Sequence, residues 1–227
     1  MSYIKNPSSI EEKSFKIIQS VIDEEHAGYT FNTEMEESII KRAIHTSGDF
    51  DYLYNLRFTH DVVNKIVDVL VQGGTIFTDS TITLNGINKR VLDQMGVKYK
   101  CLIDDEDVIK LAEEKGITRS MAAVEYAVKE EGPKIFAFGG APSALLRLLE
   151  MIEHKEAEVD AIIGVPVGFI GIEECKQVLF ESDVPAIVTL GRKGGSTIVV
   201  GIINAIIYQL KHVATDDYIR YSTPTQK

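Results

Sequence analysis

One histidine of this chain lies where it could handle a proton. It belongs to segment 42–52, RAIHTSGDFDY, in which a helical pattern gives way to small polar residues and carboxylates. Arg42 and His45 are three residues apart, so they share one face of a helix. A cation that can hold an anionic ligand would then lie beside an imidazole, a group that changes its charge between about pH 5 and 8. The alternative is a surface histidine favoured by the helix dipole, with Asp49 and Asp51 as capping or solvated carboxylates.

The helix that positions His45 has clear boundaries in the sequence. Thr33 and Glu36 form a capping box, whose side chains satisfy free N–H groups at the helix start, and Gly48 is suited to the helix end. The apolar residues between them have helical spacing: Ile39, Ile40, Ala43 and Ile44. An earlier helix carries Ser14. It follows a second capping box at 9–12, and its apolar face consists of Phe15, Ile18, Val21 and Ile22.

From residue 59 onward, helical and strand patterns alternate. A helix is predicted from about Thr59, and Gly73 is placed to end it. Short apolar runs, typical of buried strands, occur at 75–78, 98–103, 134–138, 159–164 and 186–190. Helical patterns separate them, at 108–114, 120–129, 144–152 and 175–180. We therefore predict an α/β fold, with a mostly parallel sheet of about five strands and helices on both faces. We expect one domain over residues 1–213 and a flexible tail at 214–227.

Three predicted strands lead into glycine-rich turns that precede helices: FAFGGAPSAL, IIGVPVGFIG and VTLGRKGGSTI. Glycine lets the backbone approach a ligand closely, and free N–H groups of the following helix turn attract carboxylate or phosphate. Because ligands collect at the carboxyl ends of parallel strands, the turns together predict an anion site, with Arg192 and Lys193 as cations. The alternative is that the glycines only make tight turns. Neither nucleotide-binding glycine motif has its required spacing, and Ser143 and Ser196 have no base visible in the sequence.

The composition restricts the classes of function. With 227 residues, 44% of them hydrophobic, the chain can bury a sizeable core. A formal net charge of -10 without a long basic run argues against a nucleic-acid partner. The opening residues lack a signal-peptide apolar region, and the longest apolar run is too short to cross a bilayer, so we expect a cytoplasmic protein without a membrane partner. Cys101 and Cys175 have neither disulfide nor zinc spacing, and no metal-ligand cluster is visible.

The same segments, in the same order, resemble the precorrin-8X methylmutases of cobalamin biosynthesis. The resemblance covers about residues 3–210 and includes YIKNPSSIEEKSFKII, RAIHTSGDFDY, TIFTDS with the following NGI, ITRSMAA, GGAPSALL, GVPVGFIG, CK and GRKGGS. It implies an isomerase that moves a methyl group between adjacent carbons of ring C of a corrin precursor, giving hydrogenobyrinic or cobyrinic acid, without cofactor or protein-bound metal. It also implies a homodimer with a tetrapyrrole substrate. The GDFDY ending is more similar to the branch that inserts cobalt early, which indicates cobalt-precorrin-8.

The resemblance also implies roles for individual residues. His45 would handle a proton at ring C, while Ser14 and Arg42 would contact the substrate. With the glycine turns, it predicts further substrate contacts at Thr46, Arg119, Ser143, Arg192, Gly194, Gly195 and Ser196. The chain departs from the family pattern at three positions: at Gly140, where asparagine is expected, at Ile82, where methionine is expected, and at Cys175, where serine is usual.

Two other classes of function remain open from the sequence. A non-catalytic corrinoid carrier would use the same loops but would not need a titrating group such as His45 at ring C. A phosphate-cofactor enzyme would also use glycine loops, although the missing motifs disfavour it. A coloured corrinoid retained by the purified protein would favour the methylmutase and the carrier over the phosphate-cofactor enzyme.

Overall fold

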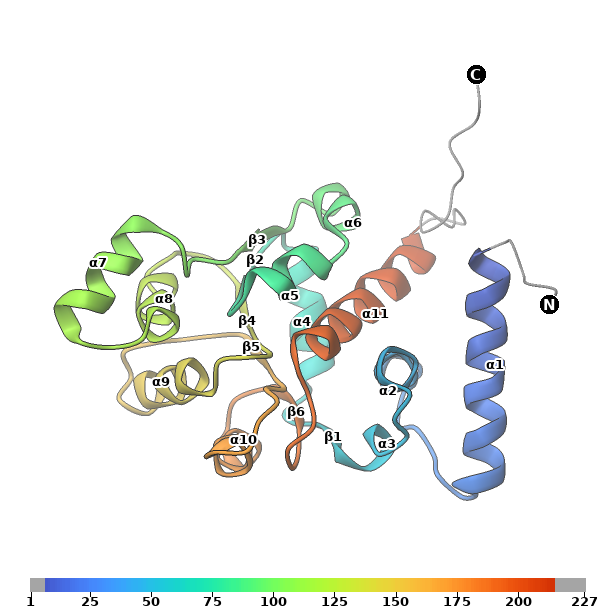
Figure 1. Ribbon diagram of the computed structural model, residues 1–227. Coiled ribbons are helices and arrows are strands. Elements are labelled where there is room, and N and C mark those ends of the chain that lie inside the picture. Colours follow the sequence, from blue (N-terminus) through green and yellow to red (C-terminus); the bar gives the residue numbers. More distant parts are fainter. Residues whose placement is uncertain (1–6, 215–227) are drawn as a thin grey trace.

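The centre of the molecule is a six-stranded sheet of order β1-β6-β5-β4-β2-β3 (Figure 1). The computed structural model describes residues 7–214. Its strands are β1 (Leu56–Phe58), β2 (Thr75–Thr78), β3 (Lys98–Lys100), β4 (Lys134–Phe138), β5 (Ala161–Gly164) and β6 (Ala186–Thr189). All neighbouring pairs are parallel except β1 and β6, which are antiparallel. The predicted α/β class with a mostly parallel sheet is confirmed.

The predicted number of strands was one too low. β1 has only three residues, LRF, and no alternating pattern, and its partner β6 comes much later in the chain. The helix predicted from Thr59 begins at Val62, because Thr59 extends the pairing beyond β1 and donates its N–H to the Ala186 carbonyl at 2.9 Å. Three predicted strands were too long: 98–103 and 186–190, because β3 and β6 end earlier, and 159–164, because β5 begins later.

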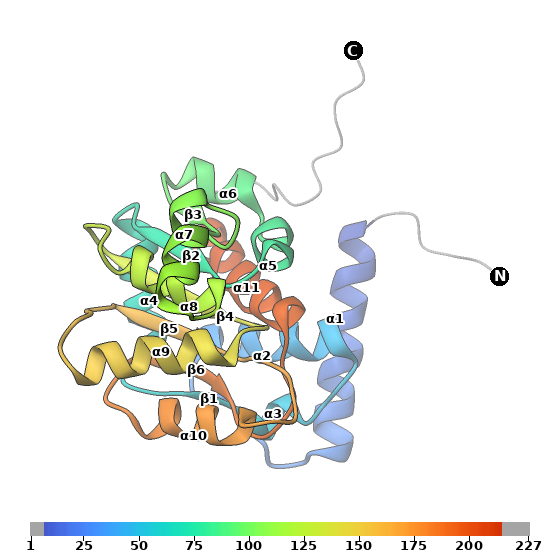
Figure 2. The same ribbon diagram turned by 60° about the vertical axis from the view of Figure 1, so that its left-hand side comes forward.

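Both faces of the sheet are covered by helices. On one face, the strands pack against α2 (Glu34–Ser47), α4 (Val62–Val71) and α11 (Ser196–Ala214) through Ile76, Ile135, Ile163 and Ile187. On the other face, they pack against α8 (Arg119–Ala127), α9 (Pro142–Glu153) and α10 (Ile172–Glu181) through Phe77, Phe136, Ile162 and Val188 (Figure 2). Successive strand residues point to opposite faces, so burial on both sides explains why the strand sequences are continuously apolar.

The other helices of the described chain lie around this core. They are α1 (Pro7–Glu25), α3 (Tyr52–Asn55), α5 (Thr81–Gly86), α6 (Lys89–Gln94) and α7 (Glu106–Lys115). α1 lies outside α2 (Figure 1) and buries Ile18 and Ile22 in the same apolar core as α2 and α11. α3, α5 and α6 were not predicted, because four or six residues are too few to show helical periodicity.

Local signals at the ends of α2 are largely confirmed. The Thr33 side chain accepts a hydrogen bond from the Glu36 N–H at 3.1 Å, and Gly48 ends the helix in the left-handed conformation with φ 70°. The Glu36 carboxylate instead accepts a hydrogen bond from the Asn32 amide at 2.8 Å, so only half of the predicted capping box is formed. The box predicted at 9–12 is wrong as a helix start, because α1 begins before residue 9.

The predicted extent of the domain and its tail stays a prediction. The tail expected at 214–227 lies outside the described residues, apart from Ala214 at the end of α11. Within the described part of the chain, no helix is both long and apolar enough to cross a membrane.

Candidate active site

Two glycines bring three helices together around His45. A Cβ atom on Gly201 of α11 would lie only 3.1 Å from Oγ1 of Thr46 on α2. A Cβ atom on Gly86, at the end of α5, would lie 2.5 Å from Cγ2 of Val200 on α11. Because glycine has no side chain, α2 and α5 can both approach α11 closely at these positions.

A pocket of about 310 Å³ lies between these helices, at the small end of the range for small-molecule sites. It is lined by Arg42, His45, Thr46, Ile82, Gly86, Thr197, Val200, Gly201 and Asn204. His45 is exposed at this pocket, and its ring stacks on the ring of Phe15 from α1, with the two centroids 5.5 Å apart. The imidazole is therefore accessible to a ligand while a neighbouring ring fixes its plane.

Arg42 lines the same pocket, but its guanidinium has a partner within the protein. It forms an ion pair with Glu11 of α1 and lies over the Phe15 ring, 4.6 Å from the ring centroid. The two side chains of the pair are only 10% and 9% exposed. A ligand carboxylate would therefore share Arg42 with Glu11. Ser14, also on α1, donates its hydroxyl to the Ile10 carbonyl at 2.8 Å and does not line the pocket.

The third glycine turn, residues 191–195, is tied to the segment that follows α2. The Lys193 ammonium lies 2.6 Å from the Asp49 carboxylate and 2.5 Å from that of Asp51. Burial by itself raises the pKa of Asp49, but hydrogen bonds from Lys193 and from the Asp51 N–H outweigh it and lower the pKa. The same two carboxylates raise the pKa of Lys193. This predicted cation is thus held by the protein's own acids, next to the helix that carries His45.

The first glycine turn holds a carboxylate of the protein itself. Asp79 directly follows β2. Its Oδ2 accepts hydrogen bonds from the backbone N–H groups of Gly139, Gly140 and Ala141 at 2.9, 2.7 and 2.8 Å. Asp79 is 9% exposed, and burial raises its pKa although these hydrogen bonds oppose the shift. The expectation that this turn binds a ligand anion is therefore corrected: the anion cradle exists, and Asp79 fills it. A carboxylate placed directly after a buried strand was the sequence signal for this contact.

The second and third glycine turns bind each other. Gly195 donates its N–H to the Val165 carbonyl at 2.7 Å, and Gly168 donates to the Arg192 carbonyl at 3.3 Å. A Cβ atom on Gly194 would lie 2.1 Å from the Val165 oxygen, and the φ angles of Gly194 and Gly195, 151° and 121°, are ones that L side chains rarely adopt. Larger residues at either position would therefore disturb the fold as well as any ligand contact.

The pocket unites Arg42, His45 and Thr46, whereas the other predicted contact residues lie outside its lining. Arg192 forms an ion pair with an acidic side chain of α10 at 2.6 Å. The remaining three lie at helix starts: Ser196 begins α11 and hydrogen-bonds another serine at 3.1 Å, Ser143 lies in the first turn of α9, and Arg119 begins α8 on the opposite face of the sheet. Sequence analysis did not predict the contributions of Glu11, Phe15, Thr197 and Asn204.

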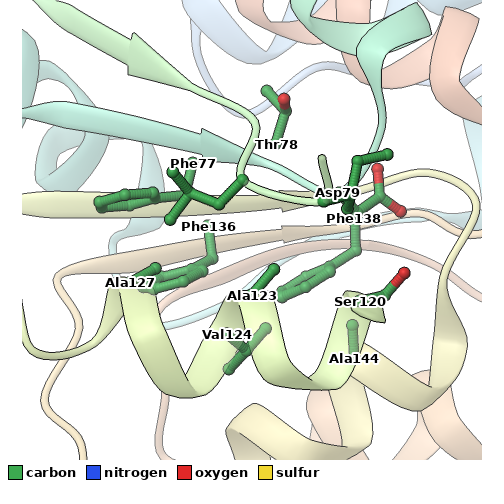
Figure 3. A pocket seen from close by; sticks show the side chains of 12 residues that line it. Phe77, Thr78, Asp79, Ser120, Ala123, Val124, Ala127, Phe136, Phe138 and Ala144 are labelled. Atoms are coloured by element: carbon green, nitrogen blue, oxygen red, sulfur yellow. The ribbon is translucent and has the colours of Figure 1, made fainter. Parts of the chain in front are cut away.

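A second cavity lies on the other face of the sheet, against α8 (Figure 3). Its volume of about 20 Å³ has room for about one water molecule. The rings of Phe77, Phe136 and Phe138 line it, and Figure 3 shows Asp79 and Ser120 near the same end. This space is too small for an organic substrate, whereas the larger pocket beside His45 has room for part of one, so we take the His45 pocket as the candidate active site.

The described residues offer no obvious place for a protein-bound metal. In this part of the chain, no group of three or more His, Cys, Asp or Glu side chains could hold a metal ion. Cys101 and Cys175 are free thiols, and burial raises the pKa of Cys175 to about 11. The phosphate-cofactor alternative is also weakened, because the N–H groups of the first turn are bonded to Asp79 rather than free for a phosphate.

The family model of precorrin-8X methylmutase matches residues 9–209, which include the pocket and all three glycine turns. The chain belongs to the precorrin-8X methylmutase family. It is 46% identical to the cobalt-precorrin-8 methylmutase of Salmonella typhimurium, over 93% of this chain and 99% of that protein. It is 32% identical to the precorrin-8X methylmutase of Sinorhizobium sp, over 90% and 95% of the two chains. The structure of precorrin-8X methylmutase from Thermus thermophilus matches with a TM-score of 0.79 and 32% identity, over 91% of this chain and 100% of that one.

Methylmutases are isomerases, so this family member is an enzyme of intramolecular methyl transfer. The three residues that depart from the expected family pattern, Ile82, Gly140 and Cys175, lie in different parts of the structure. Ile82 is 66% exposed at the pocket. Gly140 lies beside the Asp79 carboxylate, and a Cβ atom there would be 3.9 Å from Asp79 Oδ2 and from Ser196 Oγ, an ordinary contact distance. Cys175 is buried and donates its thiol to a carbonyl of α9 at 3.7 Å.

Proposed function

We propose that this methylmutase moves a methyl group between adjacent carbons of ring C of cobalt-precorrin-8, and that His45 handles the accompanying proton. The observation that carries the proposal is an exposed histidine, stacked on Phe15, at a pocket whose wall includes Arg42 and Thr46. The cobalt form of the substrate is supported by two relatives, 46% and 36% identical, that are both cobalt-precorrin-8 methylmutases.

The pocket suits the chemistry of such a migration. Protonation of the ring system by a positioned imidazole makes the migrating bond easier to break, and a reaction within one molecule needs no second reactant. Arg42 and Thr46, within one helical turn of His45, offer a cation and a hydroxyl to a carboxylate arm of the macrocycle. The pocket of about 310 Å³ is smaller than a tetrapyrrole. We therefore expect it to receive the ring C edge, with the rest of the macrocycle outside.

Single-turnover conversion of cobalt-precorrin-8, followed by absorbance, tests the role of His45. His45→Ala should bind the corrinoid within a few-fold of wild type, because most contacts lie elsewhere, yet lose on the order of 100- to 10,000-fold in rate. His154→Ala, which changes an exposed histidine at the end of α9, is the matched control and should keep wild-type turnover. Turnover close to wild type in His45→Ala would remove this residue from the mechanism and point to another proton source.

We also infer a homodimer that works in the cytoplasm. Exposed apolar side chains on α1 and on the second glycine turn support a subunit interface: Ile17 is 65% exposed, Phe169 82% and Ile170 92%. The two free thiols are in keeping with a reducing compartment. Light scattering of the purified protein should give twice the mass of one chain. A monomer at micromolar concentration would contradict the dimer.

A further inference from the structure

Lys176 of α10 is a lysine inside the protein, with an exposed fraction of 0%. Its ammonium donates hydrogen bonds to Oγ1 of Thr189 at 3.1 Å and to the Lys193 carbonyl at 2.8 Å. Within the described residues, no carboxylate lies within ion-pair distance of it. Moving an ammonium out of water into neutral surroundings is costly. A lysine in this position therefore lowers the stability of the folded chain at neutral pH, where an unbranched apolar side chain such as methionine would not.

The pKa of Lys176 is shifted in the direction that this cost of burying a charge predicts. Burial lowers the pKa to about 8, although Cys175 and Glu173 on the same helix act in the opposite direction. The unfolded chain keeps its proton up to the ordinary lysine pKa, about 10.4. Below pH 8 both states carry the proton and the cost is fully present. Between about pH 8 and 10.4 only the unfolded state binds the proton, so this cost is progressively removed as the pH rises.

Lys176 binds the backbone in the middle of the third glycine turn. The Lys193 carbonyl accepts one bond from the Lys176 ammonium and a second, at 2.8 Å, from the Thr189 hydroxyl. The Lys193 side chain extends to Asp49 and Asp51, beside the end of α2. The turn then leads into α11, whose second residue, Thr197, lines the His45 pocket. Lys176 is thus connected through the turn to two walls of the pocket.

We propose that Lys176 is a positioning residue of the substrate site, which fixes turn 191–195 so that Lys193 and the start of α11 meet a carboxylate arm of the tetrapyrrole. This inference rests on the proposed function. The ammonium is the stronger donor, so the turn is held more firmly when Lys176 is charged. Substrate affinity should consequently fall as the pH rises through about 8, the pKa of Lys176.

Few other groups near the turn titrate in that range. Burial raises the pKa of Cys175 to about 11, and the two aspartates raise that of Lys193. The pKa of Asp49 is lowered by Lys193 and by a backbone N–H, against the effect of its burial. Glu173, the charged group that also acts on Lys176, forms a surface ion pair with Arg192 of the turn. A loss of affinity near pH 8 would therefore report on Lys176.

The test compares Lys176→Met with wild type and with Lys110→Met, which removes an exposed lysine of α7. Methionine is one atom shorter than lysine and keeps most of its unbranched apolar stem, and the Thr189 hydroxyl still satisfies the Lys193 carbonyl. Affinity for cobyrinic acid, the product expected from cobalt-precorrin-8, is titrated by absorbance between pH 6.5 and 9.5. It should weaken roughly five- to tenfold through pH 8 in wild type and in Lys110→Met. Lys176→Met should bind weakly at every pH, with an unfolding temperature at pH 7 at or above that of wild type.

Each other outcome has a definite meaning. A lower unfolding temperature for Lys176→Met would make the lysine a structural residue and overturn the proposal, and so would wild-type affinity in this variant. An affinity of wild type that does not change through pH 8 would also overturn it. A wild-type protein that does not bind the corrinoid at any pH would instead refute the proposed function, because that result does not depend on Lys176.

Discussion

The ring of Phe15 on α1 stacks on the ring of His45 on α2, with centroids 5.5 Å apart and an interplanar angle of 23°. The same phenylalanine also lies under the Arg42 guanidinium, 4.6 Å from its centroid. α1 therefore does more than cover apolar surface of α2, because one of its side chains contacts both residues that we expect to act on the substrate.

Replacing Phe15 should separate orientation of the imidazole from substrate binding. Phe15→Leu keeps an apolar side chain but removes the flat surface that fixes the His45 ring, so we expect single-turnover rates to fall roughly tenfold, about 1.4 kcal/mol in the barrier. Corrinoid affinity should change much less. Ile17→Leu, at a 65% exposed position of the same helix, is the control. Equal rates in Phe15→Leu and wild type would show that the stacking does not position His45.

The ion pair between Glu11 and Arg42 leads us to expect separate effects of Arg42 on substrate affinity and on stability. Arg42→Ala should weaken corrinoid affinity by about 1.5 to 3 kcal/mol, the usual value of a charge-assisted contact. It should also reduce the free energy of unfolding by roughly 3 to 5 kcal/mol, because it removes the ion partner of a buried carboxylate. The double variant Glu11→Gln/Arg42→Ala should recover much of the stability but none of the affinity, as measured by urea unfolding and absorbance titration. Recovered affinity in the double variant would mean that Arg42 does not touch the substrate.

Asp79 should be essential for the first glycine turn. Asp79→Ala leaves the three N–H groups of residues 139–141 without their acceptor. Each buried N–H group without an acceptor lowers the free energy of unfolding by about 1 to 3 kcal/mol. We therefore expect a loss of at least about 3 kcal/mol in urea unfolding at pH 7. An undiminished stability would mean that water replaces the carboxylate without cost.

Asp79→Asn provides the pH test for the same contact. Because burial raises the pKa of Asp79, the folded wild type binds a proton more readily than the unfolded chain, and its stability falls as the pH rises from about 4 through that raised pKa. Asparagine cannot titrate. The stability of Asp79→Asn relative to wild type should therefore increase over this pH range, and a constant difference would contradict the raised pKa.

The contact between Asp49 and Lys193 should matter at low pH. The pKa of Asp49 is lowered, so its contribution to stability is present above the ordinary aspartate value of about 3.9 and is lost as the pH falls through the lower, folded-state pKa. We expect Asp49→Asn to reduce the free energy of unfolding by less than about 1 kcal/mol at pH 7, since the pair is partly exposed. The difference from wild type should shrink as the pH falls below about 3.9. A difference that does not change with pH would come from packing rather than charge.

The amino-acid sequence alone predicted the parts of this protein that depend on neighbouring residues. Thr33 and Gly48 mark the two ends of α2 because a cap requires only a side chain or a φ angle within one turn of the helix. The buried strands were recognised because burial on both faces leaves continuous apolar runs. β1, α3, α5 and α6 were not predicted because each is too short to show a period.

Tertiary structure decided what the candidate site residues contact. Spacing along the chain placed Arg42 beside His45, but only the packing of α1 on α2 brings Glu11 and Phe15 to them. The anion cradle at residues 139–141 was visible in the sequence, whereas its occupant, Asp79, arrives from a neighbouring strand of the sheet. Local periodicity carries no information about which distant charge will be buried nearby, because the fold as a whole determines that choice.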